Sequence, residues 1–219
     1  ELESPTSKPY IDLTLKTLKD FNLKITNNNY SQFIIPGRQR YRKKIFYQLQ
    51  GDWSSAALLL TGGAISRDVT VKNLIINSSQ ADERILEVFK AAGVEFEVVE
   101  GPKYLIMCGD VPCAFRDNPD DEDCCSGRVD VKGSKLPYKP FEFDATDSPD
   151  LFPPLVVLAL NCDGESRIKG VSRLYNKESN RAETLFSEFV KLGADIDIQG
   201  DYMMVRGGKL HGGYCNTHG

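Results

Sequence analysis

Residues 175–181 carry the side chains whose type and spacing best suit chemistry. Lys177 and Arg181 lie four positions apart, with the carboxylate Glu178 between them. They stand at the start of residues 182–193, whose apolar positions recur with the period of an amphipathic helix. The helix dipole disfavours cations there, whereas cations beside free backbone N–H groups suit an anion. From the spacing alone, however, a surface salt-bridge cluster is the commoner arrangement.

Capping residues predict where the helix over 182–193 begins and ends, and apolar composition predicts that the helix before it is buried. We expect Asn176 to cap the helix over 182–193 and Gly193 to end it. Asp150 opens a second helix, residues 150–160, and could simply cap it. That helix is apolar throughout and must be buried. The sequence therefore predicts helices inside the molecule and sheets outside.

A helix–strand–turn–strand pattern occurs three times. Residues 85–96 align with residues 185–196, and a glycine falls at the end of both helices. A third copy starts with a helix over 11–23, where Asn22 takes the place of the glycine. Such repeats indicate one supersecondary unit packed several times around shared cores. The expected return strands are residues 30–35, 104–107 and 202–205.

A further helix and strand precede the second and third copies, so the complete unit is helix–strand–helix–strand–strand. One such helix begins near Ser54, with Asp52 or Ser54 as its cap. Residues 111–141 interrupt the pattern, and the acidic residues 117–123 predict a solvated surface loop. A calcium loop is excluded because its ligand spacing and central glycine are missing.

Composition narrows the class of protein. The 219 residues carry a net charge of −4 and a pI near 5.3, which argues against nucleic-acid or membrane-surface binding. No apolar run approaches the ~20 residues that span a bilayer, and the first residues do not resemble a signal peptide. Six cysteines without a C-x-x-C pair, and two histidines, predict reduced thiols in a cytoplasmic protein and no metal site.

Several motifs occur in the order seen in one enzyme family. Residues 7–12, residues 51–56, Pro149-Asp150 and the Lys-Glu-x-x-Arg of residues 177–181 together resemble 5-enolpyruvylshikimate-3-phosphate synthase. The resemblance implies an α/β (α+β) fold, an inside-out barrel of repeated βαβαββ units with buried helices and outer mixed sheets, here incomplete. Residues 1–50 would be the last part of a first domain and residues 51–219 most of a second. A fragment of about half the enzyme is not expected to turn over alone.

The resemblance also implies a reaction and its partners. The enzyme would transfer an enolpyruvyl group from phosphoenolpyruvate to the 5-hydroxyl of shikimate-3-phosphate, in the chorismate pathway to aromatic amino acids. This addition–elimination needs one base at the alcohol, one acid/base at the methylene carbon and cations for the anionic groups. It requires neither a metal nor an organic cofactor. The intact enzyme would be monomeric and inhibited by glyphosate.

Three positions are implied as catalytic. Asp150 would be the base at the 5-hydroxyl nucleophile, and Glu178 would exchange the proton at the methylene carbon of phosphoenolpyruvate. Lys177 would lie near the 5-hydroxyl and the bridging oxygen, and would also bind substrate. Asp150 and Glu178 thus supply the pair of carboxylates that the chemistry needs.

The remaining implied positions bind substrate. Ser7 would contact the phosphate of shikimate-3-phosphate, and Tyr10 would flank that molecule. Arg181 would bind the carboxylate or the phosphate of phosphoenolpyruvate. Arg173 stands where the family commonly has an asparagine that contacts the sugar-like ring, although a cation there could still pair with an anion. A serine before proline and a half-buried tyrosine are also common scaffolding.

Two other functions compete with this interpretation. The related enolpyruvyl transferase that acts on UDP-N-acetylglucosamine shares the repeats and the reaction. A non-catalytic repeat module that binds a partner protein would leave Asp150, Lys177, Glu178 and Arg181 pointing in different directions. Four other polar residues are expected to have structural roles: Ser54, Ser55, His211 and His218.

Overall fold

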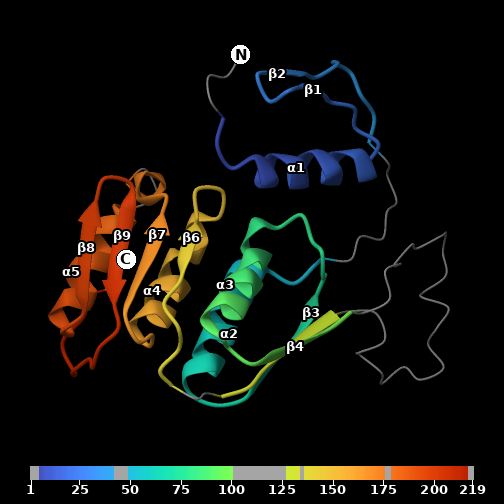
Figure 1. Ribbon diagram of the computed structural model, residues 1–219. Helices are drawn as coiled ribbons and strands as arrows, with labels where there is room; N and C mark the ends of the chain where they lie inside the picture. The colour runs from blue at the N-terminus through green and yellow to red at the C-terminus, as the bar shows by residue number, and fades with distance from the viewer. Residues whose placement is uncertain (1–4, 42–48, 101–126, 134–135, 176–178, 217–219) are drawn as a thin grey trace, which may run out of the picture.

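The first segment of the chain is a helix followed by a short hairpin. The computed structural model describes residues 5–41, 49–100, 127–133, 136–175 and 179–216. Helix α1 (Lys8–Asp20) leads into strands β1 (Thr26–Asn28) and β2 (Gln32–Ile34), which pair antiparallel. Figure 1 shows this segment lying over one end of the remaining chain. Its strand β1 extends through Asn28, so the predicted turn at residues 27–29 starts later than expected.

The next unit contains a buried helix, a second helix and a three-stranded sheet. Asp52 caps the first helix by accepting hydrogen bonds from the backbone N–H groups of Ser54 and Ser55, as the sequence allowed. A 3-10 helix, η1 (Ala81–Arg84), leads into the second helix. The sheet order is β3-β5-β4, with antiparallel neighbours. The elements are α2 (Trp53–Ile65), β3 (Val69–Leu74), α3 (Ile85–Ala92), β4 (Phe96–Val99) and β5 (Gly127–Val131).

The last unit repeats this arrangement and adds a parallel strand at one edge. Its sheet order is β6-β7-β9-β8, so β7, β9 and β8 correspond to β3, β5 and β4. The predicted repeat of helix–strand–helix–strand–strand is therefore present in both units. The elements are β6 (Glu142–Asp144), η2 (Pro149–Leu151), α4 (Phe152–Leu160), β7 (Glu165–Lys169), η3 (Val171–Leu174), α5 (Arg181–Lys191), β8 (Asp195–Gln199) and β9 (Tyr202–Arg206).

The return strand predicted over residues 104–107 lies outside the described residues. Strand β5 (Gly127–Val131) pairs with both β3 and β4 in the position that β9 takes in the later unit. It falls within residues 111–141, where the sequence predicted an interruption, so the pattern continues over part of that stretch. The acidic residues 117–123 also lie outside the described residues.

All three repeated helices end with the same backbone reversal. Gly93 and Gly193 follow α3 and α5 with φ values of 81° and 86°, and Asn22 follows α1 with a φ of 63°. This left-handed region favours glycine and, next, asparagine. The expectation that Asn22 takes the glycine's place is confirmed.

Helix α5 begins one residue before the expected residue 182, and its cap is a different asparagine. It runs from Arg181 to Lys191, and its cap is Asn180, whose side chain accepts a hydrogen bond from the backbone N–H of Glu183. The prediction of Asn176 as cap was wrong, because a second asparagine four residues later offers the same oxygen to the first turn. Arg181 is consequently the first helical residue.

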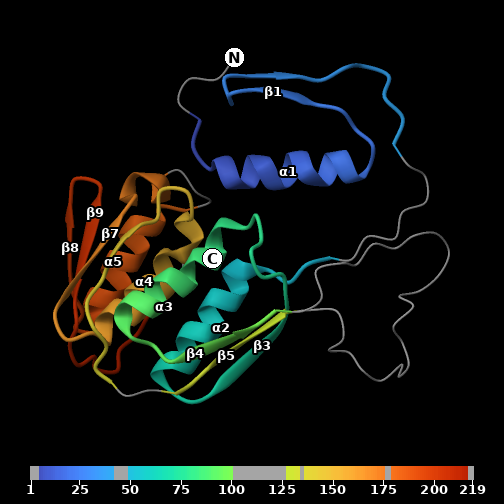
Figure 2. The ribbon, with the colours of Figure 1, turned by 45° about the vertical axis from the view of Figure 1, so that its right-hand side comes forward.

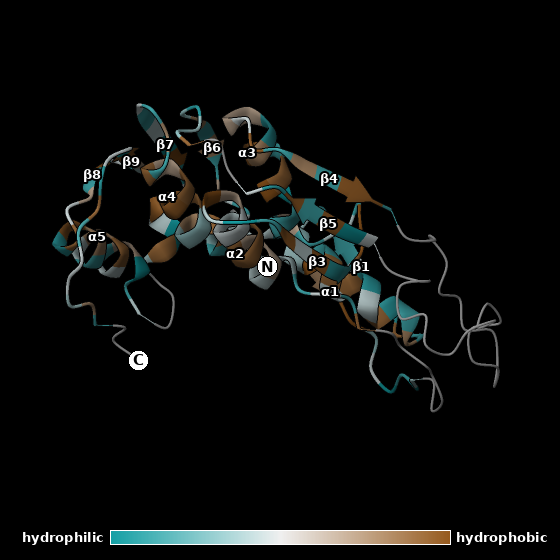
Figure 3. Cartoon of the chain, turned by 90° about the horizontal axis from the view of Figure 1, so that it is seen from below, coloured by the Kyte–Doolittle hydropathy of each residue, from teal (hydrophilic) through white to brown (hydrophobic). Residues whose placement is uncertain are grey.

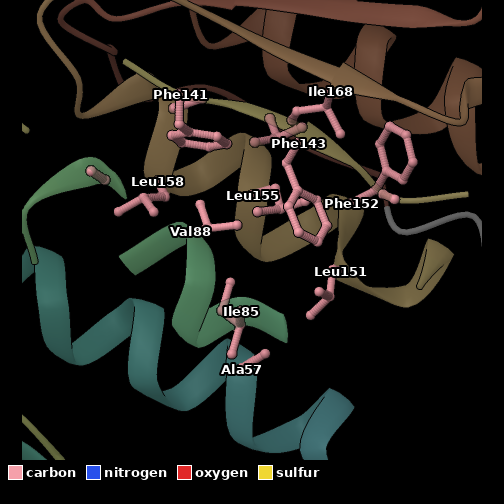
Figure 4. Packing of buried hydrophobic residues seen from close by; sticks show 14 of the residues in the cluster. Ala57, Ile85, Val88, Phe141, Phe143, Leu151, Phe152, Leu155, Leu158 and Ile168 are labelled. Atoms are coloured by element: carbon pink, nitrogen blue, oxygen red, sulfur yellow. The ribbon is translucent and has the colours of Figure 1, made fainter. Parts of the chain in front are cut away.

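A single apolar core joins the two units. Helix α4 is almost entirely buried, and it packs against α2. Figure 4 shows Leu155 and Leu158 of α4 facing Ile85 and Val88 of α3. Figure 2 places α2, α3, α4 and α5 between the two larger sheets, and Figure 3 shows α4 as mostly hydrophobic. Helices inside and sheets outside are thus confirmed for these two units, whereas α1 has no buried residue. Within the described residues the sheets do not close into a barrel.

Among the described residues, no helix has the length and apolar character needed to cross a membrane.

Candidate active site

Asp150 and Arg181 meet although they are far apart in the sequence. Nη1 of Arg181 donates a hydrogen bond of 2.5 Å to Oδ1 of Asp150, and the two side chains are 33% and 29% exposed. Asp150 lies in η2, just before the buried helix α4, whereas Arg181 is the first residue of α5. The ion pair is partly sheltered and still open to solvent on one side. A base and a cation therefore share one accessible position.

The helix-cap interpretation of Asp150 does not fit its contacts. Helix α4 has Leu151 at its cap position and no side-chain cap hydrogen bond, and the same holds for η2 with Ser148. The carboxylate of Asp150 turns instead toward Arg181. A carboxylate that caps a helix would accept from backbone N–H groups of the first turn. Asp150 is thus held by a side chain and not by its own helix.

Ser7 and Arg173 form a second contact at the same place. Nη2 of Arg173 donates to Oγ of Ser7 at 2.6 Å, and its Nε donates to the carbonyl of Thr146 at 3.3 Å. The backbone N–H of Ser7 donates to Oδ1 of Asp147 at 3.1 Å. Thr146 and Asp147, which accept these two hydrogen bonds, belong to the same short stretch as Asp150, residues 146–150. Three distant segments of the chain therefore converge on this short stretch.

The backbone of Ser7 adopts an uncommon conformation. Ser7 has a φ of 57°, in the left-handed region, and takes the cap position of α1 without a side-chain cap hydrogen bond. A non-glycine residue in this conformation is uncommon, and such residues concentrate at functional sites. The Ser7 hydroxyl is committed to Arg173 instead of to its own helix.

Arg173 is placed by close backbone contacts around its 3-10 helix. Gly170, at the start of η3, has a φ of 106°, and a Cβ there would lie 2.8 Å from the backbone nitrogen of Thr146. Asp201, in the β8–β9 turn, accepts from the N–H groups of Gly170 and Ser172, both at 2.8 Å. These contacts fix η3 against both the site stretch and the turn.

Tyr10 and Ser54 share a buried carboxylate that the sequence did not point out. The hydroxyl of Tyr10 donates to Oδ2 of Asp82 at 2.9 Å, and the hydroxyl of Ser54 donates to the same oxygen. Asp82 lies in η1 and is 1% exposed. Its signal in the sequence is an acidic residue three positions before the apolar face of α3. That signal alone also fits an ordinary helix-start residue.

Ser54 and Ser55 keep the structural roles expected of them. Their N–H groups bind the cap residue Asp52, and the hydroxyl of Ser55 also donates to Asp52 at 2.5 Å. His211 lies after β9, and its backbone N–H donates to the carbonyl of Leu192, the residue that follows α5. His218 lies outside the described residues.

The electrostatics of the Tyr10–Asp82 pair follow from burial. Burial raises the pKa of Asp82, and the negative charge of Asp150 adds to this rise, against the hydrogen bonds from Ser54 and Tyr10. Burial and the charge of Asp82 raise the pKa of the Tyr10 hydroxyl. Tyr10 therefore remains protonated, and able to donate, through the physiological range.

Lys177 and Glu178 lie outside the described residues, so their predicted roles stay predictions. Their neighbour Arg181 is placed at the site. Within the described part of the chain, no group of three or more His, Cys, Asp or Glu side chains could hold a metal ion.

The contacts describe what this place can do. It combines one partly exposed carboxylate with two guanidinium groups and a serine hydroxyl. Guanidinium groups match the planar geometry of carboxylates and phosphates, and the carboxylate can accept a proton from a nearby hydroxyl. The arrangement suits an anionic small molecule that carries a reactive alcohol.

A family model matches the chain from residue 1 to residue 219, and it is described as EPSP synthase (3-phosphoshikimate 1-carboxyvinyltransferase). A 3-phosphoshikimate 1-carboxyvinyltransferase of Clostridioides difficile is 34% identical over 97% of this chain and 42% of its own length. Another, of Methanocaldococcus jannaschii, is 33% identical over 99% of this chain and 44% of its own length. The chain thus spans less than half the length of these curated relatives.

Two solved structures share the fold. An EPSP synthase from Acinetobacter baumannii superposes with a TM-score of 0.67 at 21% identity, over 94% of this chain and 44% of that one. The enolpyruvyl transferase NikO from Streptomyces tendae superposes with a TM-score of 0.56 at 15% identity, over 91% of this chain and 40% of that one. At these identities the likeness is one of fold.

Proposed function

The chain belongs to the EPSP synthase family, and we propose that it forms part of an enzyme that transfers the enolpyruvyl group of phosphoenolpyruvate to shikimate-3-phosphate. The observation that carries this proposal is the meeting of Asp150 with Arg181, beside the contact of Ser7 with Arg173. A module without catalytic function has no need to gather these side chains. Family membership supplies the identity of the two substrates.

The proposed reaction is an addition followed by an elimination. The 5-hydroxyl oxygen forms a bond to C2 of phosphoenolpyruvate, its proton passes to Asp150, and the methylene carbon gains a proton. The bond from C2 to the phosphate oxygen then breaks, and the new methyl group loses a proton so that the double bond returns. Inorganic phosphate is released with the proton that Asp150 had accepted, which restores the Asp150 carboxylate. Glu178, next to Lys177, is the proposed acid and base at the methylene carbon.

Arg173 and Ser7 are proposed to hold the phosphate of shikimate-3-phosphate together. The 2.6 Å bond between them places a guanidinium group beside the hydroxyl that family resemblance assigns to that phosphate. Arg181 is proposed to bind the carboxylate or phosphate of phosphoenolpyruvate while it orients Asp150. The arginine at residue 173 would thereby strengthen phosphate binding in comparison with an uncharged amide.

The complete gene product that contains this chain tests the proposal. Purified protein is mixed with phosphoenolpyruvate and shikimate-3-phosphate, and phosphate release is followed together with the mass of the enolpyruvyl product. A parallel thermal-shift titration compares shikimate-3-phosphate with UDP-N-acetylglucosamine. We expect phosphate release and stabilisation with the first acceptor. Turnover only with the nucleotide sugar would reassign the substrate, and turnover with neither would reject the function.

Two further measurements test the proposed roles of Glu178 and of the part of the enzyme outside this chain. Glu178→Gln in the complete protein is expected to abolish turnover while it spares the fold, and normal activity would remove Glu178 from the mechanism. The 219 residues alone are expected to release no phosphate, because they supply only part of the cations that two phosphates and a carboxylate need.

A further inference from the structure

We propose that Asp82 is a positioning residue of the site: its buried carboxylate holds the hydroxyl of Tyr10 and so fixes the first segment, residues 5–41, against the residues that bind substrate. The inference rests on the proposed function, since it assigns to Asp82 an effect on the binding of shikimate-3-phosphate. It adds a residue to which neither the sequence motifs nor the reaction itself points.

The first segment has no apolar anchor of its own. Helix α1 has no buried residue, and the hydrophobic core formed by the described residues begins at Trp53. Burial of apolar surface normally fixes how packed elements lie relative to one another. Within the described residues, residues 5–41 are therefore held against the later units mainly by directional polar contacts.

Among the described residues, the polar contacts that join this segment to the rest are grouped at the start of α1. Ser7, the cap of α1, binds Asp147 and Arg173, and Tyr10 binds Asp82. The carbonyl of Ser7 accepts from the N–H of Tyr10 at 3.1 Å, so the two residues are neighbours at this end of the helix. Two attachment points at one helix end fix both the position and the rotation of the helix, whereas one would leave it free to pivot. Tyr10–Asp82 is the second attachment point.

The burial of Asp82 lowers the stability of the fold, and a residue with a purely structural role would not need to be a carboxylate. The carboxylate is 1% exposed, both hydroxyl donors share Oδ2, and Oδ1 accepts no hydrogen bond from the described residues. Burying a charged group with incomplete hydrogen bonding is unfavourable. A hydrogen bond to a charged acceptor is, in return, stronger than one to a neutral acceptor. The buried carboxylate therefore destabilises the fold to some extent, but it forms strong hydrogen bonds with Tyr10 and Ser54.

The chain offers a matched control pair. Tyr30 also donates its hydroxyl to a carboxylate, that of Asp12, at 2.7 Å, but this pair is exposed and lies entirely within the first segment. Tyr10→Phe and Tyr30→Phe thus remove the same group from the same residue type. Only the first of these bonds joins the segment to the rest of the chain.

Steady-state kinetics of the complete gene product test the inference with Tyr10→Phe, Asp82→Ala, Asp82→Asn, the Tyr10→Phe/Asp82→Ala double variant and Tyr30→Phe. The KM for shikimate-3-phosphate should rise about tenfold in Tyr10→Phe and Asp82→Ala, with a much smaller fall in kcat. The double variant should resemble either single variant, because one shared bond is lost. Asp82→Asn keeps an acceptor oxygen and should recover part of the affinity. Tyr30→Phe should leave KM unchanged.

The possible failures are separable. Phosphate release by the parent protein together with an unchanged KM in Tyr10→Phe overturns the inference and leaves the function standing. Additive effects in the double variant, or an equal rise in KM with Tyr30→Phe, also overturn it. Absence of turnover in the parent protein rejects the proposed function itself. Tyr10→Phe changes no packing volume, so the test does not depend on whether Asp82→Ala folds.

Discussion

Asp52 and Asp150 stand at corresponding places in the two repeated units, just before the buried helices α2 and α4, yet their contacts differ. Asp52 accepts from two backbone N–H groups and caps its helix. Asp150 makes no cap and binds Arg181. The same residue type at the same place thus stabilises the fold in one unit and belongs to the candidate site in the other. The difference lies in the groups that contact the carboxylate: backbone N–H groups of its own helix at Asp52, and the guanidinium group of Arg181 at Asp150.

The largest effect should come from Asp150. Asp150→Asn in the complete protein should lower turnover by about 10²–10⁴-fold, because the proposed general base is lost while shape is kept. The thermal midpoint should change little, since no cap is removed. Phosphate release and a melting curve check both expectations. Asp163→Asn, in the exposed turn after α4, is the matched control. Full turnover in Asp150→Asn would place Asp150 with Asp52 among structural residues.

The buried helices should respond to truncation according to which face is changed. Leu155 of α4 is 0% exposed, whereas Leu59 of α2 is 59% exposed. Leu155→Ala should lower the free energy of unfolding by about 2–5 kcal/mol, and Leu59→Ala by about 0.5 kcal/mol or less. Urea unfolding of the complete protein measures the difference. Similar losses would show that a further part of the protein covers Leu59.

Asp52 should matter for stability and not for turnover. Asp52→Ala should lower the free energy of unfolding by about 1 kcal/mol, the usual value of a helix cap. Phosphate release should stay close to that of the parent protein. Asp52→Asn, which keeps a capping oxygen, should restore most of the stability. If Asp52→Ala instead loses activity with unchanged stability, the contrast with Asp150 disappears.

A smaller effect, on stability at low pH, is expected from β6. Among the described residues, only the later unit has such an additional edge strand. Hydrogen bonds with Thr146 and Lys169 lower the pKa of Asp144, in β6, to about 2. A carboxylate whose pKa is lower in the folded state than in the unfolded chain stabilises the fold at pH values above its ordinary pKa near 4. This contribution disappears as the pH falls toward 2. Because the pair is largely exposed, screening keeps the effect small.

The melting temperature between pH 7 and pH 2.5 checks this expectation. Asp144→Asn should flatten the acid limb of the profile, and Lys169→Ala should flatten it less, because the hydrogen bonds from Thr146 remain. An acid limb that neither substitution alters would assign the loss of stability to other carboxylates.

Local patterns in the sequence predicted the repeat, the buried helix α4 and the left-handed break at Asn22, since each depends on nearby residues. Strand β5 was missed, because it lies in the predicted interruption and only its pairing across the sheet with β3 and β4 identifies it. The cap of α5 moved from Asn176 to Asn180 for a similar reason: two asparagines compete, and local chemistry does not rank them.

The candidate site was predictable only in part. Family resemblance pointed to Asp150, Arg181, Ser7 and Tyr10, but no sequence pattern indicated how they pair. Asp82 escaped attention because its partners, Tyr10 and Ser54, lie 72 and 28 residues away and meet it only in the folded chain. A buried carboxylate has no signature in a single sequence beyond its residue type.

The turn between β8 and β9 has a length that the fold cannot easily change. It consists of Gly200 and Asp201, and Asp201 holds the backbone of the 3-10 helix that carries Arg173. An inserted residue would move Asp201 relative to Gly170 and Ser172 and so shift the guanidinium group of Arg173. This short turn of the later unit thus acts as a spacer that sets where a distant side chain lies.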